Sequence, residues 1–405
     1  MNWSIFAWRN LWRSTQRTLL TMSTIGVTAF AASMALGYVL ATFDAVREGS
    51  IQSGVGHLQI LHSGYLDKIG DRPLQYSLTA QEQTAAERAV GGLRNVATTA
   101  RQIDFDGLIS NGDLSYGFVG EGVEPGREPA GYFDYHAVLS GRYVKAGAAG
   151  TEVVVGAELA RKLGIQVGSV VSLMVSTTRG GINATDAQVV GIISTGTKDL
   201  DDRIVNIPFT AAQNLLRTDK ASRLTVFLDR TADTAAAAQI LRHALPGQDV
   251  RTWDQIVTLY HQIVSLYRNQ FSVFGAILSL TILLSMSNWI LMSVMERRQE
   301  ISTLRALGVP VSVVRFVFVN ETALLGLLGG VTGIVCAVLL MTALNHAQFH
   351  LPPPPGRVKP VLLEFAVSPT AVLGVASAFV ILGIVAALTA TAGLLKRDIL
   401  KGFAS

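Results

Sequence analysis

Two histidines, His346 and His350, have the spacing of a possible metal-binding pair, because residues four apart share one face of a helix. No third ligand is evident nearby, and Pro352–Pro355 follow at once. Cys336 is the only cysteine, which excludes an intramolecular disulfide and a CxxC redox pair. No Ser/His/Asp set or carboxylate pair stands out, and the nucleotide-binding pattern G-x-x-x-x-G-K-[ST] does not occur. The sequence therefore predicts no catalytic residue, no metal site and no cofactor in this chain.

A short charged segment, residues 295–310, is more informative than any of these side chains. Its apolar residues recur along one side of a helix: Ile301, Leu304 and Leu307. Gly308 and Pro310 then end the helical pattern. A generic basic loop between two membrane spans would not need such an ordered ridge. The segment therefore predicts a small amphipathic helix that presents both charge and an apolar ridge at a membrane surface.

The composition indicates a membrane protein. Of the 405 residues, 49% are hydrophobic and only 15% are charged, whereas soluble domains carry about 25% charge. Four stretches are long enough to cross a bilayer as helices: residues 18–43, 271–295, 316–345 and 370–395. The first continues for more than ten residues past Ala31, which favours a membrane span over a cleaved signal peptide. A net charge of +4 without a basic patch argues against nucleic acid as a partner.

The basic residues predict the orientation of these spans. They flank the spans in three groups: Arg9, Arg13 and Arg17; Arg297, Arg298, Arg305 and Arg315; Lys396, Arg397 and Lys401. All three groups lie on one side if the spans alternate, and the positive-inside rule makes that side cytoplasmic. Both termini, the loop 296–315 and the tail 396–405 are therefore expected inside. Residues 44–269 and a proline-rich loop, 346–369, are expected outside.

The N-terminal segment, residues 1–17, interleaves tryptophan and phenylalanine with arginine. This pattern fits a helix lying in the membrane interface, or an aromatic belt at the foot of the first span. At the other end of the outer region, apolar and aromatic residues recur at three and four from Trp253 to Asn269 without a proline or glycine. We expect this stretch to extend the second span outward as a stalk, giving one helix of about 40 residues and about 60 Å. The alternative is an amphipathic helix that only covers the outer domain.

The outer region has a mixed α/β pattern, with room for one large domain or two small lobes. Thr79 and Glu82 form a capping-box pattern that opens a helix over 80–93, and Thr210 with Gln213 has the pattern of another helix start. The remaining expected elements are helices at 158–163 and 232–244 and strands at 152–156, 168–175, 187–194 and 224–228.

Two features of the third span concern packing. Glu321 lies near its start, and a carboxylate deep in lipid is costly. We expect Glu321 to anchor the cytoplasmic boundary beside Arg315, with a role in coupling as the alternative. Four glycines form two small-x-x-x-small pairs: Gly326 with Gly330, and Gly329 with Gly333. Such pairs permit close contact between two helices. The neighbouring helix could belong to another subunit.

The segment from Glu300 to Gly308 resembles E-I-G-x-L-R-A-L-G, the pattern after the second span in the MacB/LolC/FtsX group of ABC permeases, with Ser302 replacing a glycine. These permeases are also called type VII or mechanotransmission transporters. Further similarities cover nearly the whole chain. Glu321 with 324–330 resembles the start of the family's third span, and residues 56–60 and 153–168 resemble its outer domain. The segment 396–401 resembles the family's basic tail but lacks the proline usual there. The segments 56–60 and 153–168 resemble the lipoprotein-releasing branch.

The resemblance implies a fold class: an α-helical polytopic membrane protein with four transmembrane helices in a 1+3 layout and a large α+β periplasmic domain between the first two. It also implies that the loop after the second span is the coupling helix that docks on an ATPase. The matching residues are Arg297, Arg298, Glu300, Ile301, Leu304, Arg305, Leu307 and Gly308. ATP and Mg would be bound by that separate ATPase, present in two copies, beside a second, identical or homologous permease.

The resemblance further implies a Gram-negative inner-membrane protein that moves lipoprotein or other amphiphilic cargo from membrane lipid to a periplasmic carrier. Two alternatives remain. One is an exporter subunit that works with a periplasmic adaptor and an outer-membrane channel. The other is a non-transporting permease that controls a cell-wall hydrolase.

Overall fold

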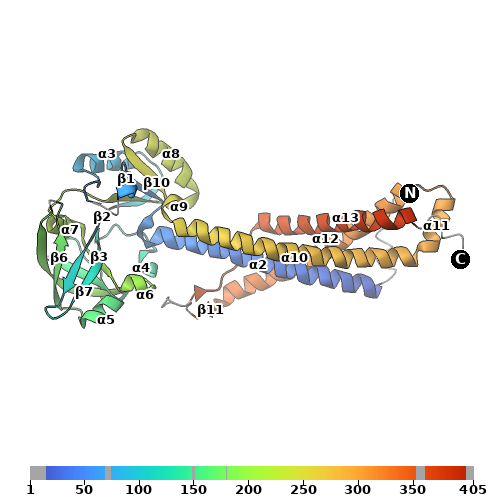
Figure 1. The fold of residues 1–405 in the computed structure, drawn as a ribbon, viewed down its shortest axis with the longest axis horizontal. Helices are drawn as coiled ribbons and strands as arrows, with labels where there is room; N and C mark the ends of the chain where they lie inside the picture. Colours follow the sequence, from blue (N-terminus) through green and yellow to red (C-terminus); the bar gives the residue numbers. More distant parts are fainter. Residues whose placement is uncertain (1–14, 69–73, 148–150, 179, 353–360, 398–405) are drawn as a thin grey trace. The chain divides into compact units, whose positions relative to one another are not determined.

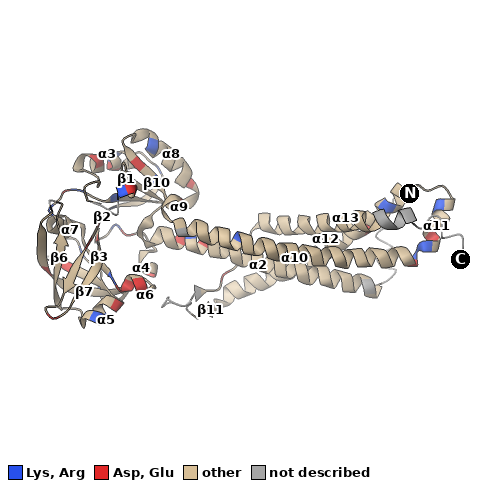
Figure 2. Cartoon of the chain, in the orientation of Figure 1, with Lys and Arg blue, Asp and Glu red and all other residues tan. Residues whose placement is uncertain are grey.

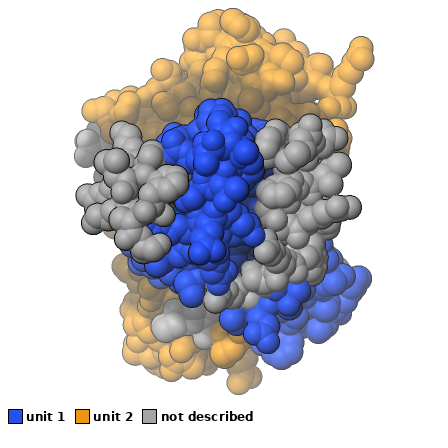
Figure 3. All heavy atoms as spheres, turned by 90° about the vertical axis from the view of Figure 1, so that its right-hand side faces the viewer, with its two compact units in different colours: residues 1–44, 263–350, 362–405 blue, residues 45–262, 351–361 orange. Residues whose placement is uncertain are grey.

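The computed structural model describes residues 15–68, 74–147, 151–178, 180–352 and 361–397. These residues form two compact units, coloured separately in Figure 3. Unit 1 comprises residues 1–44, 263–350 and 362–405, and unit 2 comprises residues 45–262 and 351–361. Most of the N-terminal segment 1–17 and of the tail 396–405, and the centre of the proline-rich loop, lie outside the described residues.

Four long helices confirm the four predicted spans, and each is apolar and long enough to cross a membrane. They are α2 (Thr15–Ser50), α10 (Thr258–Glu296), α12 (Val311–Ala347) and α13 (Pro369–Arg397), visible in Figure 1. Two of them pass from one unit into the other, because the boundaries fall at 44/45 and 262/263. In Figure 2 their charged residues are sparse, whereas charges gather at α11 (Arg298–Ala306), the short helix between α10 and α12.

The predicted stalk is part of α10, which is a single helix of 39 residues. It begins at Thr258 and not at Trp253, because Val257 (φ −85°, ψ 75°) separates it from the short helix α9 (Trp253–Ile256). Trp253 instead packs with Ile51 and Phe227 in a small core of unit 2. The apolar pattern continues past this break, and Tyr260 of α10 packs partly against the same small core.

The four glycines of α12 face other helices of the same chain. A Cβ on Gly329 would lie 2.8 Å from the Ile25 side chain, and a Cβ on Gly333 would lie 2.1 Å from the carbonyl oxygen of Gly26. Both neighbours belong to α2. A Cβ on Gly326 would lie 2.7 Å from the carbonyl oxygen of Phe379 on α13, and Gly330 faces the same phenylalanine at 3.4 Å. The two small-residue pairs therefore seat α12 between α2 and α13.

This geometry predicts opposite results for two alanine substitutions on α12. Gly333→Ala should force α2 and α12 apart and destabilise unit 1 by about 1–3 kcal/mol, as overpacking does. Gly330→Ala is the matched control, because its nearest neighbour at 3.4 Å leaves an added methyl at ordinary contact distance. Thermal melting of the detergent-solubilised chain measures both. Equal melting temperatures for the two variants would contradict the close approach of α2.

The remaining elements belong mainly to unit 2. The shorter helices are α3 (Ala80–Gly91), α4 (Tyr132–Tyr135), α5 (Ala157–Leu163), α6 (Lys198–Asp201), α7 (Phe209–Leu216) and α8 (Thr234–Ala244), with η1 (Ile51–Val55), η2 (Leu66–Lys68) and η3 (Thr231–Asp233). The strands are β1 (Leu58–His62), β2 (Val96–Ser110), β3 (Ser115–Val123), β4 (Ala137–Gly141), β5 (Glu152–Gly156), β6 (Val170–Ser176), β7 (Ile182–Ser194), β8 (Ile204–Pro208), β9 (Arg223–Leu228), β10 (Gln248–Thr252), β11 (His350–Leu351) and β12 (Val361–Leu362).

Unit 2 contains a closed ring of strands in the order β2-β3-β8-β5-β7-β6, because β6 pairs with both β7 and β2. The β3–β8 and β5–β7 pairs are parallel and the other pairs in the ring are antiparallel. Alternate residues point into the ring and form its core, for example Val153, Val155, Leu173 and Val205. Helices α5 and α7 contribute Leu159 and Leu216 to the same core.

A second lobe of unit 2 continues the same sheet, in the order β10-β1-β9-β2. Helices α3 and α8 pack on it around a separate apolar core that includes Ile60, Ala86, Val226 and Leu241. The long strand β2 joins the lobes, pairing with β9 up to Gln102 and with β3 from there on. Unit 2 is therefore built on one continuous sheet, and each lobe has its own main apolar core.

Most local predictions in unit 2 are confirmed, including the capping box of Thr79 and Glu82 at the start of α3. The prediction of a helix start at Thr210 was wrong. Helix α7 begins at Phe209, with Pro208 in the capping position and no side-chain cap. Proline favours this place because it has no N–H to leave unpaired and a fixed φ.

Candidate functional site

The candidate site is the turn between α10 and α12, residues 297–310, which contains the predicted coupling residues. We call this segment the elbow. Helix α10 ends at Glu296, Arg297 leaves helical geometry (φ −102°, ψ 18°), and α11 follows. The N–H of Gly308 donates to the Arg305 carbonyl at 3.0 Å, which closes the end of α11. Gly308 has φ +90°, a value that glycine adopts at low cost, so its position in the motif has a steric reason.

Arg297 and Glu321 form an ion pair at the base of this elbow. Arg297 Nη1 donates to Glu321 Oε1 at 2.9 Å, and the side chains are 14% and 0% exposed. The prediction that Glu321 lies beside Arg315 was therefore wrong. Residues six apart on an α-helix point about 120° away from each other, so Arg315 cannot share the direction of Glu321. Arg297 was expected only as a coupling residue, and its pairing with Glu321, 24 positions later, has no signature in the sequence.

The predicted apolar ridge of α11 is divided between two surroundings. Ile301, with Val309 and Val311, packs against the buried cluster that α10, α12 and α13 form. Leu304 is half-buried, whereas Leu307 is 77% exposed. One part of the ridge therefore holds α11 to unit 1, and Leu307 is left on the outward face.

The outward face of α11 carries mixed charge and one large apolar side chain. Arg298, Glu300 and Leu307 are exposed there, and Arg305 is half-buried. They combine both signs of charge with one large apolar side chain, which is the mixture found in the rims and anchors of protein interfaces. Among the residues that the structure describes, no group of three His, Cys, Asp or Glu is arranged to hold a metal ion.

Two family models match the chain. The MacB-like periplasmic core domain matches residues 18–244, and the FtsX-like permease C-terminal domain matches residues 272–395. The first of these covers more than half of the chain, and its match runs from α2 through most of unit 2. The second covers α12 and most of α10 and α13, with the elbow between them. Together they reproduce the predicted 1+3 layout.

The chain is also similar to individual proteins. The lipoprotein-releasing system transmembrane protein LolC of Neisseria meningitidis serogroup B is 23% identical over 334 residues, 78% of this chain and 74% of that protein. The pyoverdine export ATP-binding/permease protein PvdT of Pseudomonas entomophila is 30% identical over 166 residues, 38% of this chain and 25% of that protein. The solved periplasmic region of MacB from Actinobacillus actinomycetemcomitans aligns with a TM-score of 0.37 at 14% identity, over 50% of this chain and 92% of that one.

The matched domains, the four apolar helices and the mixed α/β domain between the first two all confirm the resemblance seen in the sequence. The chain is therefore a multi-pass membrane protein that belongs to the family of ABC transporter permeases with a MacB-like periplasmic core domain and an FtsX-like C-terminal domain.

Proposed function

We propose that the chain is the permease subunit of an ABC transporter that moves lipoprotein or other amphiphilic cargo from the inner membrane to a periplasmic acceptor. A separate ATPase hydrolyses ATP, and the permease passes the resulting motion outward as mechanotransmission. The observation that carries the proposal is α10, a 39-residue helix that begins in unit 2 and ends at the elbow. The relative named as a lipoprotein-releasing transmembrane protein supports this choice of cargo.

The elbow is suited to transmit force, because one face of α11 is exposed to a partner while its other face is fastened to the membrane helices. An ATPase that binds the outward face of α11 would move a helix that Ile301 and the Arg297–Glu321 pair fasten to α10 and α12. Helix α10 spans about 58 Å at 1.5 Å per residue, so a displacement at its cytoplasmic end can be carried along the helix as far as Thr258. In this proposal α11 and both termini are cytoplasmic, and unit 2 lies in the periplasm of a Gram-negative cell.

The assembly proposed here contains two ATPase copies, which hold the ATP and Mg, and a second permease that is either this chain or a homologue. A second candidate function is export of a small molecule or peptide through a periplasmic adaptor and an outer-membrane channel. The relative named as a pyoverdine export protein favours this candidate. Both functions use the same elbow, and they differ in what unit 2 meets outside the membrane.

Leu307→Asp tests the elbow as the ATPase contact. Because Leu307 is 77% exposed, the substitution should leave the fold unchanged and place a charge in the docking surface. We expect cargo release from proteoliposomes to fall about 10- to 100-fold, the effect of losing an interface anchor, with less ATPase retained on the permease. Leu139→Asp is the control, since Leu139 is also exposed, at 60%, but lies in unit 2. Unchanged cargo release in Leu307→Asp would contradict the proposal.

A further inference from the structure

His57 lies immediately before β1 in unit 2, at the point where the pairing of β1 with β9 ends. Its main-chain N–H donates to the Val226 carbonyl of β9 at 2.9 Å. In the antiparallel register of the two strands, the residue opposite Leu228 would be Gly56. Gly56 has φ +70°, however, and its N–H donates to the Ile51 carbonyl at 3.1 Å. The main chain therefore turns away before it can pair with Leu228.

The imidazole of His57 takes the place of the missing main-chain partner. The N–H of Leu228 donates to His57 Nδ1 at 3.0 Å, and the two residues are 5% and 3% exposed. A main-chain N–H can only donate, so Nδ1 presents a lone pair and carries no proton. The neutral ring then has its proton on Nε2, which faces Thr231 Oγ1 at 3.2 Å. The surroundings of His57 therefore fit the neutral imidazole.

Thr231 extends this contact to the end of α2. Its hydroxyl accepts from His57 Nε2 and donates to Glu48 Oε1 at 3.0 Å. Glu48 belongs to the part of α2 that lies within unit 2, and Thr231 is the first residue of η3. His57, Thr231 and Glu48 thus form one chain of hydrogen bonds, which we call the latch. The latch connects the last turn of α2 with β9 and η3.

The charge that acts on His57 is that of Glu48. Burial lowers the pKa of His57 from its ordinary value of 6.5, and the negative charge of Glu48 opposes this shift in part. The surrounding segments α2 (within unit 2), β1, β9, β10, η3 and α9, with the residues between β9 and η3, carry other charged or titratable residues: Arg47, His62, Arg223, Asp229, Arg230, Asp233, Asp249, Arg251 and Asp254. Arg47 contacts Glu48 at 3.4 Å, and Asp233 accepts from Asn95 at 2.9 Å. Asp229 and Arg230 are exposed. Burial therefore sets the direction of the shift, toward the neutral imidazole.

We propose that the latch is an acid-responsive connection, which fastens the end of α2 to β9 and η3 at neutral pH and opens when His57 takes up a proton. The proton adds to Nδ1, and the ring then has an N–H at both nitrogens. The N–H of Leu228 and the new N–H of Nδ1 face each other, so the buried main-chain donor loses its acceptor. This inference goes beyond the proposed function and does not depend on the cargo or the ATPase.

The direction of the pH effect follows from the two states of His57. In the open latch the imidazole is in water and has its ordinary pKa of 6.5, whereas burial lowers the pKa in the closed latch. The open form therefore binds protons more readily, and the closed form is fully favoured only above pH 6.5. As the pH falls below that value, the ratio of open to closed latch rises by up to about tenfold per pH unit, until the lowered pKa is reached.

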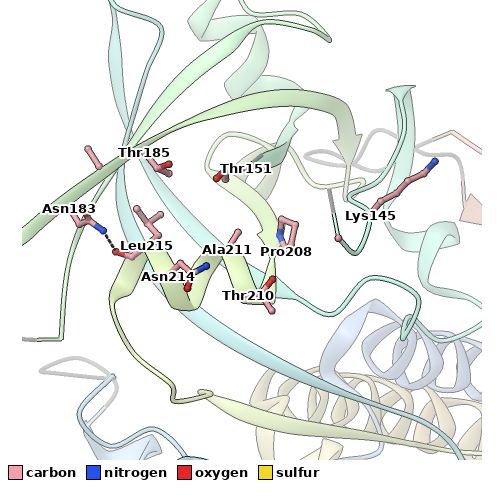
Figure 4. Close-up of a pocket in the computed structure, with 11 residues that line it drawn as sticks. Lys145, Thr151, Asn183, Thr185, Pro208, Thr210, Ala211, Asn214 and Leu215 are labelled. Carbon is pink, nitrogen blue, oxygen red and sulfur yellow. Dashed lines mark hydrogen bonds between the residues drawn. The ribbon is translucent and has the colours of Figure 1, made fainter. Parts of the chain in front are cut away.

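Hydrogen–deuterium exchange of the full chain in detergent micelles tests the proposal. The amides followed are those of Leu228 and of residues 48–58, with correction for the pH dependence of the exchange reaction itself. Between pH 7.5 and pH 5.5 we expect their protection to fall about five- to tenfold in the wild-type chain. The internal reference is α7, beside which Asn183 Nδ2 donates to the Leu215 carbonyl at 2.7 Å (Figure 4). Among the described residues, the pocket at this helix is lined by no histidine or carboxylate, so the protection of α7 should stay constant.

His57→Asn separates the proton from the hydrogen bond, because its side-chain oxygen can accept from Leu228 but does not titrate. Its protection should change by less than about twofold over the same pH range. His243→Asn is the matched control, since His243 is an exposed histidine of α8 in the same unit, and it should keep the wild-type pH dependence. Protection at Leu228 that is independent of pH in the wild type, or that falls equally in His57→Asn, would overturn the proposal. An equal loss in α7 would also overturn it, in favour of general unfolding by acid.

Discussion

Arg297→Met is expected to remove most ATP-driven cargo release, and adding Glu321→Gln is expected to restore a large part of it. Glu321 is fully buried, and its carboxylate receives a hydrogen bond from Arg297 at 2.9 Å. Removing one partner of a buried pair costs about 3–5 kcal/mol, and here it removes a 2.9 Å ion pair from a fully buried carboxylate. The single variant should therefore loosen α11 from α12, whereas the double variant leaves two uncharged side chains in contact.

The measurement is cargo release and ATP hydrolysis in proteoliposomes that contain the permease and its ATPase. We expect about 100-fold lower release for Arg297→Met, in line with that cost, and continued ATP hydrolysis because the ATPase itself is intact. Arg268→Met is the control, since Arg268 is an exposed arginine of the same helix α10. If the double variant were as inactive as the single one, Arg297 would have a role other than compensating Glu321.

The sequence was sufficient for the elements of unit 1, and insufficient for the contacts between them. Apolar length predicted the four helices, and the spacing of Gly329 and Gly333 predicted close packing of α12. Spacing alone cannot say which helix comes close, because any apolar helix satisfies the same requirement. The structure places α2 there, with Gly26 opposite Gly333. The same limitation explains why Arg315, near in sequence, was preferred to Arg297 as the partner of Glu321.

The elbow illustrates a second limitation. A helical repeat shows that Ile301, Leu304 and Leu307 lie on one side, but it cannot show how far the supporting helices extend beneath that side. In the structure the support ends near Leu304, so Ile301 is packed and Leu307 is exposed. That Leu307 is exposed follows only from where α10 and α12 end in the three-dimensional structure.

In unit 2, strands were predicted more successfully than their pairing. Short runs rich in apolar and β-branched residues located β5, β6, β7 and β9. Pairing in the ring depends on residues far apart in the sequence, for example Leu108 beside Met174.

The junction between the two lobes of unit 2 depends on one arginine that sequence reasoning did not select. Arg223 begins β9 beside the point where β2 changes its partner from β9 to β3. Its guanidinium forms ion pairs with Asp104 of β2 and, at 2.8 Å, with Glu121 of β3. Its Nε donates to Gln102 at 2.8 Å. One side chain therefore compensates two carboxylates, and burial raises the pKa of Glu121 above its ordinary value.

Arg223→Met is expected to destabilise unit 2 by about 3 kcal/mol at pH 7, because it leaves Asp104 and Glu121 adjacent without a counter-charge. For a domain of this size the melting temperature should fall by about 6–12 °C. The loss should shrink as the pH falls toward 4. The pKa of Glu121, which burial already raises, rises further without Arg223, so protonation of Glu121 at low pH relieves the folded variant. Arg161→Met, which removes an exposed pair with Glu158, is the control and should leave the melting temperature nearly unchanged. Melting of the full chain in micelles at pH 7 and pH 4.5 measures these effects, and an equal loss at both values would mean that packing, and not charge, is what Arg223 contributes.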